Sequence, residues 1–478
     1  MKYNSALLTD LYELTMIQGY LKYDYNPGVV FDMFFRRQPF DGGFSIFAGL
    51  EDLLKSLTTL SFSSSDLEYL GGLKIFSRPF LDYLADFRFK GDIYSVDEGL
   101  PVFPDEPLIR VHASLIEAQL IESYLLNVIN FQTLIATKTA RIYLASGKGT
   151  ILEFGLRRAQ GLDGAVSASR AAFIGGAAAT SNTLAGKMFG IPVKGTMAHS
   201  WVMSFENELE AFEKYAEVYP DECTLLIDTY DTLGSGLVNA IKVGRRLLNE
   251  GHHNFGIRLD SGDLEYLSKK VREEMDKAGL HEAKISVSNE LDENIIHQLL
   301  TDGAPIDYWG VGTNLVTAKG DSALTGVYKL KAREKDGRFQ PTIKVSNNPE
   351  KTTNPGIKQV YRFFNGDDCP IGDLIAMDDE KLIPDRSYRF YHPRYLHRSM
   401  HVSKSSRIEP LLSLKMKGGE ISADLPDLQT IQRRCKENLD RIDSSYKRLI
   451  NPHIYKVSIS PKLRDLKVSM IEEYSNRR

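Results

Sequence analysis

The chain has 478 residues, of which 42% are hydrophobic and 26% are charged, and its formal net charge is −4. A chain of this length can bury one large core with smaller domains around it. The negative net charge excludes nucleic-acid binding through general basicity, so a phosphate site would have to be a local cationic pocket. The three cysteines, Cys223, Cys369 and Cys435, stand far apart and encode neither a disulfide framework nor a zinc site.

The N-terminal sequence lacks a sustained apolar segment and a cleavage signal. Nowhere does the chain contain the roughly 18 uninterrupted apolar residues that a membrane-spanning helix requires. We therefore expect no membrane span and no secretion, and a cytoplasmic location.

The first predicted element is a helix whose first turn Thr9 or Asp10 can cap, with Glu13 three residues after Asp10. Tyr12 on this helix is most simply a core or interface ring. A phenol near a chain end can also reach into the pocket of a neighbouring subunit, so both interpretations stay open. The predicted shared face of the helix consists of Leu8, Leu11, Tyr12, Thr15 and Met16.

The next elements predict an N-terminal α/β lobe over residues 1–145. Residues 29–37 alternate like a strand, and residues 91–113 read as two strands around a Pro-rich turn. Ser114 and Glu117 then form a capping box for a long helix that we expect to run to about Ala140. Its apolar residues recur every three or four positions, which is typical of a helix packed on a core.

Between residue 150 and about 315, short apolar segments alternate with amphipathic helices. Successive segments from Thr224 onward start roughly 20 to 35 residues apart, the length of a βα unit, and such units close most readily as a (β/α) barrel. Six strands fall short of eight, so the predicted fold class is α/β with an irregular or incomplete (β/α) barrel over residues 146–328. The six segments are ILEF, IPVK, TLLID, FGIRLD, KISVS and YWGVG.

A smaller, β-rich C-terminal region with terminal helices is predicted over residues 329–478. The segments VYKLKARE, FQPTIKVS and VYRFF read as strands, and a charged helix is expected from about Asp424 to Arg448.

Polar residues follow nearly every predicted barrel strand, at the end where parallel α/β folds bind ligands. The segment EFGLRRAQG places Phe154, Arg157 and Arg158 after the first strand. The segment KGTMAHSW places His199 after a Gly-Thr pair and before Ser200. Backbone N–H groups and hydroxyls can bind an anion at such a place.

Three more strand ends carry side chains suited to a sugar phosphate. Arginine pairs with phosphate in a forked geometry, glycines beside hydroxyl residues expose backbone N–H groups, and aspartates can bind ribose hydroxyls or magnesium. For each aspartate alone, helix capping is the simpler interpretation, and for Asp263 the two are evenly balanced. The residues are Asp228 to Asp231, then Arg258, Asp260, Ser261, Gly262 and Asp263, and finally Gly312, Thr313 and Asn314.

Six motifs in order, from residue 7 to about 330, resemble the nicotinate phosphoribosyltransferases: LLTDLYELTM, EFGLRRAQG, KGTMAHSW, LLIDTYDT, GIRLDSGDL and YWGVGTNL. The resemblance implies a type II phosphoribosyltransferase that joins nicotinate to 5-phosphoribosyl 1-diphosphate (PRPP) with release of diphosphate, the first step of NAD salvage from nicotinic acid. It further implies coupling to ATP, a requirement for Mg²⁺ and a homodimer with composite active sites.

The resemblance also implies roles for individual residues. His199 would be the residue that ATP phosphorylates, and Arg157 and Arg258 would act in catalysis. Tyr12, from the partner subunit, and Phe154 would sandwich the pyridine ring. The metal ligands are not identified. The other substrate-binding positions would be Arg158, Thr196, Ser200, Asp260, Ser261, Gly262, Gly312 and Thr313, the last two holding the 5-phosphate.

Two alternatives remain at this point. The acceptor could be nicotinamide or quinolinate, although amide-using relatives place an Asp where this chain has Asn182, and quinolinate users lack the phosphorylatable histidine. The chain could also be a sugar-phosphate-binding barrel without catalytic activity.

Overall fold

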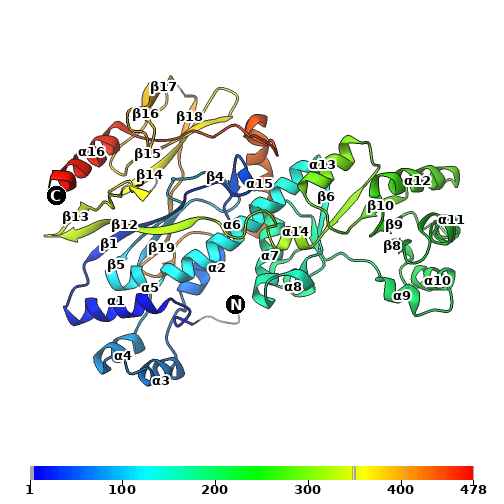
Figure 1. The fold of residues 1–478 in the computed structure, drawn as a ribbon, viewed down its shortest axis with the longest axis horizontal. Helices are drawn as coiled ribbons and strands as arrows, with labels where there is room; N and C mark the ends of the chain where they lie inside the picture. Colours follow the sequence, from blue (N-terminus) through cyan, green and yellow to red (C-terminus); the bar gives the residue numbers. More distant parts are fainter. Residues whose placement is uncertain (1–4, 347, 349–350, 404, 477–478) are drawn as a thin grey trace. The chain divides into compact units, whose positions relative to one another are not determined.

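The computed structural model describes residues 5–346, 348, 351–403 and 405–476 (Figure 1). By its internal contacts the chain divides into two compact units. Unit 1 comprises Met1–Leu134 and Ala323–Arg478, and unit 2 comprises Ile135–Ser322. Unit 1 is thus built from both ends of the chain. The division into three domains at residues 145 and 328 stays a proposal.

The first helix of unit 1, α1 (Leu11–Lys22), begins directly after Asp10, as predicted. Its buried side chains are Glu13, Leu14 and Ile17. The predicted shared face is largely exposed: Tyr12 keeps 51% of its surface exposed, and Leu8 and Leu11 are as open. The buried face of α1 is the one that packs on the neighbouring helix α5 (Leu115–Leu120), where Gln119 Nε2 donates a 2.6 Å hydrogen bond to Glu13 Oε2. Tyr12 is therefore not a core ring.

The main sheet of unit 1 has seven strands in the order β13-β12-β1-β5-β3-β19-β20. Its interior strand β1 pairs antiparallel with both β5 and β12, and β12 lies more than 200 residues further along the chain. Nearly every residue of β1 is buried, because the strand is covered on both faces and does not alternate. The bounds are β1 Gly28–Phe35, β3 Asp92–Ser95, β5 Ile109–Ser114, β12 Gly326–Lys335, β13 Arg338–Pro341, β19 Ser413–Lys417 and β20 Glu420–Ile421.

Further helices of the N-terminal segment complete this lobe. The capping residue Ser114 accepts a hydrogen bond from the Glu117 backbone N–H, and after α5 the chain continues as α6 (Glu122–Ala145), five residues beyond the predicted end. A short pair of strands, β2 and β4, lies beside them. Their bounds are α2 Leu50–Leu57, α3 Ser64–Gly72, α4 Arg78–Ala85, β2 Ser45–Ile46 and β4 Pro101–Val102.

A second sheet in unit 1, in the order β17-β16-β21-β15-β14-β18, confirms that the C-terminal region is β-rich. The C-terminal region also contains two helices, α15 and α16, and α15 is shorter than the predicted helix of residues 424–448. The bounds are β14 Lys358–Phe364, β15 Pro370–Met377, β16 Tyr388–Tyr391, β17 Ser399–Val402, β18 Arg407–Pro410, β21 Val457–Ile459, α15 Leu428–Arg441 and α16 Pro461–Asn476.

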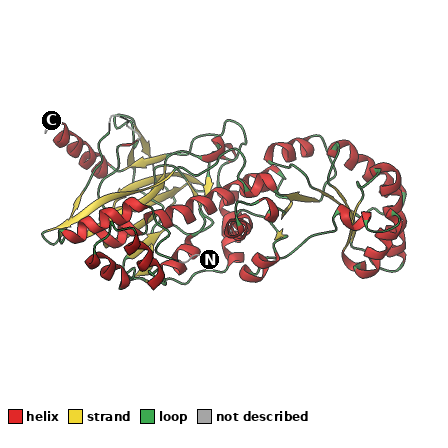
Figure 2. Cartoon of the chain, turned by 60° about the horizontal axis from the view of Figure 1, so that its bottom comes forward, coloured by secondary structure: helices red, strands yellow, loops and turns green. Residues whose placement is uncertain are grey.

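Unit 2 contains one parallel sheet of six strands in the order β7-β6-β11-β10-β9-β8, with helices packed around it (Figure 2). The sheet runs from β7 to β8 as an open half-barrel, which confirms the predicted incomplete barrel. Residues 191–193 are not a strand, because only Val193 forms an isolated bridge with Thr180. The strand bounds are β6 Thr150–Glu153, β7 Ala179–Thr180, β8 Cys223–Leu226, β9 Phe255–Leu259, β10 Lys284–Val287 and β11 Tyr308–Val311.

Helices connect these strands and cover the sheet. Asp263 caps one of them, accepting a 3.1 Å hydrogen bond from Tyr266 N, as the capping interpretation predicts. The bounds are α7 Leu162–Ile174, α8 Thr183–Phe189, α9 His199–Met203, α10 Glu208–Val218, α11 Leu237–Asn249, α12 Leu264–Lys277, α13 Glu293–Thr301 and α14 Thr313–Val316.

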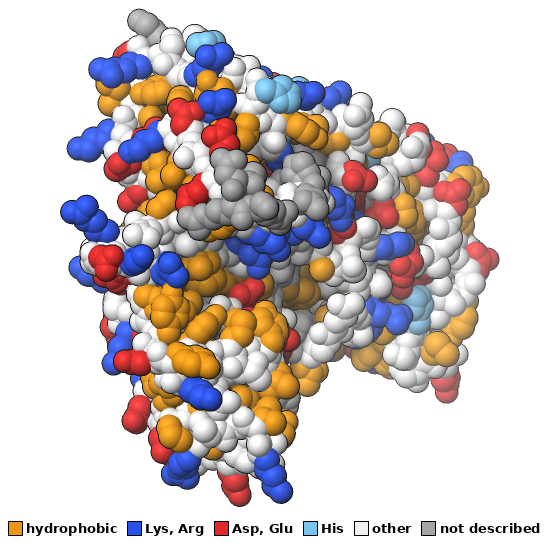
Figure 3. All heavy atoms as spheres, turned by 60° about the vertical axis from the view of Figure 1, so that its left-hand side comes forward, with side chains coloured by type: hydrophobic (Ala, Val, Ile, Leu, Met, Phe, Trp, Pro, Cys, Tyr) orange, Lys and Arg blue, Asp and Glu red, His pale blue; other side chains and the backbone are white. Residues whose placement is uncertain are grey.

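Within the described part of the chain, no helix has both the length and the apolarity needed to cross a bilayer. On the face drawn in Figure 3, basic and acidic side chains are interspersed with hydrophobic ones.

Candidate active site

The C-terminal ends of the parallel strands in unit 2 bring most of the predicted site residues to one edge of the sheet. Neighbouring strands pair in parallel register from β8 to β7, so the loops that follow them leave the sheet at the same edge. The residues that follow the strands are Phe154 after β6, Asp228 after β8, Asp260 after β9, Ser288 after β10 and Gly312 after β11.

Phe154 is half-buried, and its ring lies against the backbone of β11. A Cβ atom at Gly310 would come within 2.8 Å of Phe154 Cδ2, so a larger residue there would displace the ring. Gly155 is equally confined, since its Cβ would meet Val316 at 2.1 Å. Gly310 therefore lets the ring pack directly on the backbone of β11, and Gly155 lets the following loop pack closely on Val316.

The carboxylate of Glu153, at the end of β6, is 1% exposed and ties three segments together. It accepts hydrogen bonds from Ser169 Oγ at 2.9 Å, from Thr180 Oγ1 at 2.6 Å and from the Gly155 backbone N–H. A buried carboxylate with several donors is strongly held. Glu153 therefore positions the loop that carries Phe154.

Arg258 in β9 spreads its guanidinium across three loops. Nη1 donates to Thr196 Oγ1 at 2.6 Å and to the Met197 carbonyl at 3.1 Å, and Nε donates to Ser288 Oγ at 3.0 Å. Nη2 lies 3.4 Å from Asp260 Oδ1, and the Arg258 side chain is only 12% exposed. The fork therefore has a fixed direction at the edge of the sheet.

His199 is the first residue of α9, and its side chain keeps 39% of its surface exposed. Its Nε2 lies 3.2 Å from Asp228 Oδ1, and the Asp228 side chain is fully buried. The other oxygen of Asp228 accepts hydrogen bonds from Asp260 N at 2.9 Å and from Ser261 Oγ at 2.6 Å. One buried carboxylate thus links the histidine to the loop after β9.

The loop after β9 presents small and polar groups to solvent. Ser261 and Gly262 are exposed, and Gly262 has a φ of +80°, a left-handed conformation that glycine adopts without strain. Asp260 accepts a hydrogen bond from Ser288 Oγ, so its free surface is limited.

The remaining predicted residues are less constrained. Arg157 and Arg158 lie in a short 3₁₀ turn and are exposed, as is Ser200. Gly312 and Thr313 are half-buried directly after β11, where a Cβ on Gly312 would lie 3.1 Å from the Phe154 carbonyl oxygen. Tyr12 belongs to unit 1 and stays a predicted contributor.

Asn182 is 2% exposed, and its side chain is used inside the unit. Its Oδ1 accepts from Ala185 N at 3.2 Å and caps α8, while Nδ2 lies within hydrogen-bonding distance of Ser169 Oγ and the Ala165 carbonyl. The structure thus gives Asn182 a structural use, and a role in choosing between acid and amide rests on the resemblance alone.

Two residues that organise this site, Glu153 and Ser288, were missing from the predicted set, and Asp228 was predicted only as a strand-end residue, without its contact to His199. Asp228 and Ser288 each end a predicted strand, and Glu153 belongs to the motif EFGLRRAQG, so strand position was an available signal. Their partners come from other strands, and sequence spacing does not show which strands are neighbours. Among the described residues, no group of three His, Cys, Asp or Glu side chains is arranged to hold a metal ion.

Known proteins resemble this chain along nearly its whole length. Residues 150–375 match the nicotinate phosphoribosyltransferase (NAPRTase) family, residues 7–130 match its N-terminal domain and residues 357–467 match its C-terminal domain. The nicotinate phosphoribosyltransferase of Bacillus subtilis is 45% identical over 474 residues, covering 99% of this chain and 96% of that protein. The Caenorhabditis elegans enzyme is 37% identical, covering 96% and 92%.

A solved structure supports the same assignment. The crystal structure of human nicotinic acid phosphoribosyltransferase superposes with a TM-score of 0.86 at 30% identity, covering 97% of this chain and 99% of that one. The chain therefore belongs to the nicotinate phosphoribosyltransferase family and is an enzyme with that activity.

Proposed function

We propose that the edge of the parallel sheet in unit 2 is the catalytic site, where nicotinate reacts with PRPP to give nicotinate mononucleotide and diphosphate. The observation that carries the proposal is the network in which Arg258 holds Thr196, and Asp228 holds His199 and Ser261, across three strand ends. Such a network holds cationic and hydroxyl groups in place before an anionic substrate arrives.

The transfer itself is a substitution at the anomeric carbon of ribose. The pyridine nitrogen of nicotinate forms the new bond as the bond from carbon to the diphosphate oxygen breaks, and the electron pair leaves with diphosphate. The nitrogen already carries a lone pair, so no strong base is needed. Catalysis then rests on positioning the ring against Phe154 and on the Arg258 and Arg157 guanidiniums, which offset the charge of the leaving group.

The binding roles of the other residues follow from their chemistry. Thr196, Ser200, Asp260 and Ser261 offer hydroxyl and carboxylate groups to ribose and diphosphate, and Arg158 adds positive charge. The backbone at Gly262, Gly312 and Thr313 offers N–H donors for phosphate oxygens.

We assign His199 as the residue that ATP phosphorylates. Because the buried Asp228 carboxylate accepts a hydrogen bond from Nε2, the proton of a neutral ring lies on Nε2 and the lone pair lies on Nδ1. Nδ1 would attack the γ-phosphorus of ATP with release of ADP, and later hydrolysis would return phosphate and free histidine. The phosphohistidine would supply energy by favouring PRPP binding, without a covalent step on nicotinate.

Magnesium fits this site as an ion that arrives with the diphosphate. Mg²⁺ usually retains several waters and binds one or two carboxylates together with substrate phosphates. Asp260, whose side chain is 28% exposed, is the carboxylate best placed to contribute. When bound, the ion would offset charge on the diphosphate.

We further propose a homodimer in which Tyr12 of one subunit completes the pyridine site of the other. Support comes from the half-exposed ring of Tyr12 on a helix whose opposite face is buried. An exposed aromatic ring is suited to stacking on a flat pyridine.

Labelling with γ-phosphate-labelled ATP tests the proposal. Wild type should carry acid-labile phosphate on His199, located by peptide mass. His199→Ala should carry none, lose the stimulation by ATP and retain a slow reaction at high PRPP. His297→Ala, a change at an exposed position of helix α13, is the matched control. Equal labelling of His199→Ala and wild type would remove His199 from this role.

A further inference from the structure

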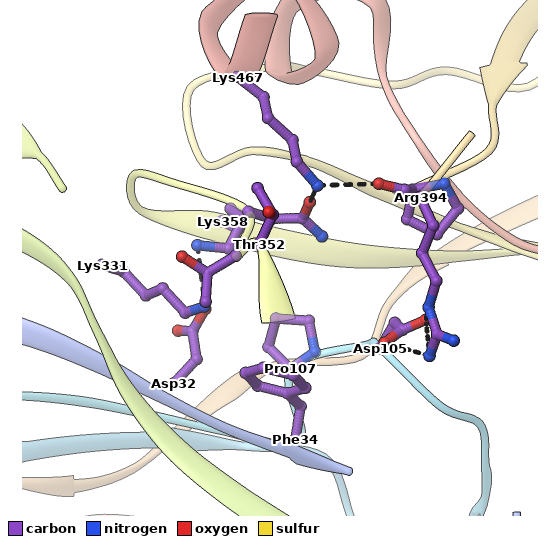
Figure 4. Close-up of a pocket in the computed structure, with 12 residues that line it drawn as sticks. Asp32, Phe34, Asp105, Pro107, Lys331, Thr352, Lys358, Arg394 and Lys467 are labelled. Carbon is purple, nitrogen blue, oxygen red and sulfur yellow. Dashed lines mark hydrogen bonds and ion pairs between the residues drawn. The ribbon is translucent and has the colours of Figure 1, made fainter. Parts of the chain in front are cut away.

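A second cluster of positive charge lies in unit 1, in a small cavity between its two large sheets. The cavity is lined by residues of β1, β12 and β14, by the loop before β17 and by α16 (Figure 4). None of the predicted catalytic residues lines it. The nitrogen-bearing residues are Lys331, Lys358, Arg394 and Lys467, and the carboxylates are Asp32 and Asp105.

Two of the four cations have carboxylate partners. Lys358 Nζ lies 2.9 Å from Asp32 Oδ2, and both side chains are 1% exposed. Arg394 donates from Nε and Nη2 to the two oxygens of Asp105, at 2.9 and 3.0 Å. Asp32 also attracts Lys331 and Asp105 also attracts Lys467, but each of these carboxylates is already paired with another cation.

Lys467 and Lys331 lack such compensation. Within the described part of the chain, Lys467, 3% exposed, donates only to neutral oxygens, Asn354 Oδ1 and the Pro393 carbonyl, each at 2.8 Å. Lys331, 2% exposed, has no hydrogen-bond acceptor among the described residues, and its ammonium lies 4.7 Å from the centre of the Phe34 ring. Figure 4 shows the two lysines reaching into the cavity from different elements.

Buried ammonium groups without counter-charges are costly. Burial lowers the pKa of Lys331 well below its ordinary value, and repulsion from Lys358 adds to the effect. Burial likewise lowers the pKa of Lys467 to about 8. With all groups ionised, four positive and two negative charges leave an excess of two positive charges facing one cavity.

We propose that this cavity binds one small inorganic oxyanion of the phosphate type, which bridges Lys331 of β12 and Lys467 of α16. A doubly charged anion matches the uncompensated charge, and its oxygens supply the acceptors that Lys331 lacks. The cavity volume is about 20 Å³, room for about one water, so the lysine side chains would have to move apart to admit the ion. A nucleotide or a sugar phosphate is far too large for it. Asp105, Pro393 and Arg394 also line a larger open pocket, which gives a route to solvent.

The ion would stabilise unit 1 by joining the sheet of β12 to the C-terminal helix α16. This site is separate from the residues proposed for catalysis and does not depend on them.

Thermal unfolding of the full-length protein in phosphate, sulfate and chloride at equal ionic strength tests the proposal. Phosphate and sulfate should raise the Tm of wild type in a concentration-dependent manner, and chloride should not. Lys331→Met and Lys467→Met should weaken phosphate binding by roughly tenfold or more, the loss expected for one charge-assisted hydrogen bond. Lys462→Met, on the same helix but 52% exposed, is the matched control.

Two further comparisons separate this site from catalysis and from packing. Arg258→Ala should keep the phosphate-dependent shift, while Lys331→Met should still make nicotinate mononucleotide. Without phosphate, Lys331→Met should be at least as stable as wild type, because it removes an unpaired buried charge. The proposal is overturned if phosphate does not raise the Tm of wild type, or if chloride raises it equally. It is also overturned if phosphate raises the Tm of Lys331→Met as much as that of wild type, or no longer raises the Tm of Arg258→Ala. A Lys331→Met protein that is destabilised equally with and without phosphate would overturn it as well.

Discussion

Asp228→Asn should separate ATP coupling from the basal transferase reaction. The Asp228 carboxylate is fully buried and accepts from three donors: His199 Nε2 at 3.2 Å, Asp260 N at 2.9 Å and Ser261 Oγ at 2.6 Å. An asparagine has only one acceptor atom. The least costly arrangement keeps that oxygen on Asp260 N and Ser261 Oγ and turns the amide NH₂ toward His199.

The size of the effect follows from the hydrogen bond that changes. A bond from His199 to a carboxylate becomes, at best, a neutral bond of reversed direction, and the proton of the ring must move to Nδ1. Bonds to charged groups contribute about 1.5–3 kcal/mol and neutral ones about 0.5–1.5 kcal/mol, so the difference is about 1–2 kcal/mol. This corresponds to a loss of roughly 5- to 30-fold in the ATP-stimulated rate.

Initial rates of nicotinate mononucleotide formation with and without ATP measure this split. The ATP-stimulated rate should fall much more than the basal rate. Asp231→Asn is the matched control, because Asp231 is exposed in the same loop and, among the described residues, its carboxylate accepts only from Gly234 N, at 3.0 Å. If folded Asp228→Asn protein keeps full ATP stimulation, or loses both rates equally, Asp228 does not position His199 for phosphorylation.

Three further changes give distinct results. Arg258→Lys keeps the charge but loses the fork that reaches three loops. The lower kcat/KM should correspond to a loss of about 2–4 kcal/mol of transition-state stabilisation. Unchanged kinetics for both substrates would exclude Arg258 from the site. Tyr12→Ala should weaken nicotinate binding more than PRPP binding, by about 0.5–1.5 kcal/mol, and mixing it with His199→Ala should restore part of the ATP-dependent activity if sites are composite. Exchange of subunits without recovered activity would place Tyr12 outside the partner's site. Burial and the nearby Arg110 lower the pKa of His112 to about 4, so the unfolded chain binds a proton first as pH falls. The free energy of unfolding, measured by urea titration, should therefore drop by up to about 3 kcal/mol between pH 6.5 and 4. His112→Phe should flatten this pH dependence. An unchanged pH dependence in the variant would show that His112 does not cause it.

The sequence alone predicts the parallel sheet and its ligand-binding edge well, because each βα unit carries its own signals. A β-rich segment, a polar turn and an amphipathic helix follow one another, and the polar turns fall at the ends where parallel strands meet. Phe154, Arg258 and Gly312 therefore lie on the predicted edge.

Features that depend on distant partners could not be predicted in this way. The buried face of α1 is set by its packing on α5, so hydropathy alone does not show that Glu13, Leu14 and Ile17 are its buried residues. The predicted strand at residues 191–193 is reduced to a bridge at Val193, because its partner β7 is only two residues long, Ala179 and Thr180. Glu153 and Asp228 gain their roles from hydrogen bonds across strands, and one residue's type does not reveal such bonds.

The most direct test of the mechanism is the amount of mononucleotide formed by purified full-length protein with PRPP and Mg²⁺, given nicotinate or nicotinamide, with and without ATP. Nicotinate should be converted to its mononucleotide with one diphosphate released per turnover, and ATP should raise the rate with formation of ADP. Product from nicotinamide alone, or binding of PRPP without release of diphosphate, would contradict the mechanism.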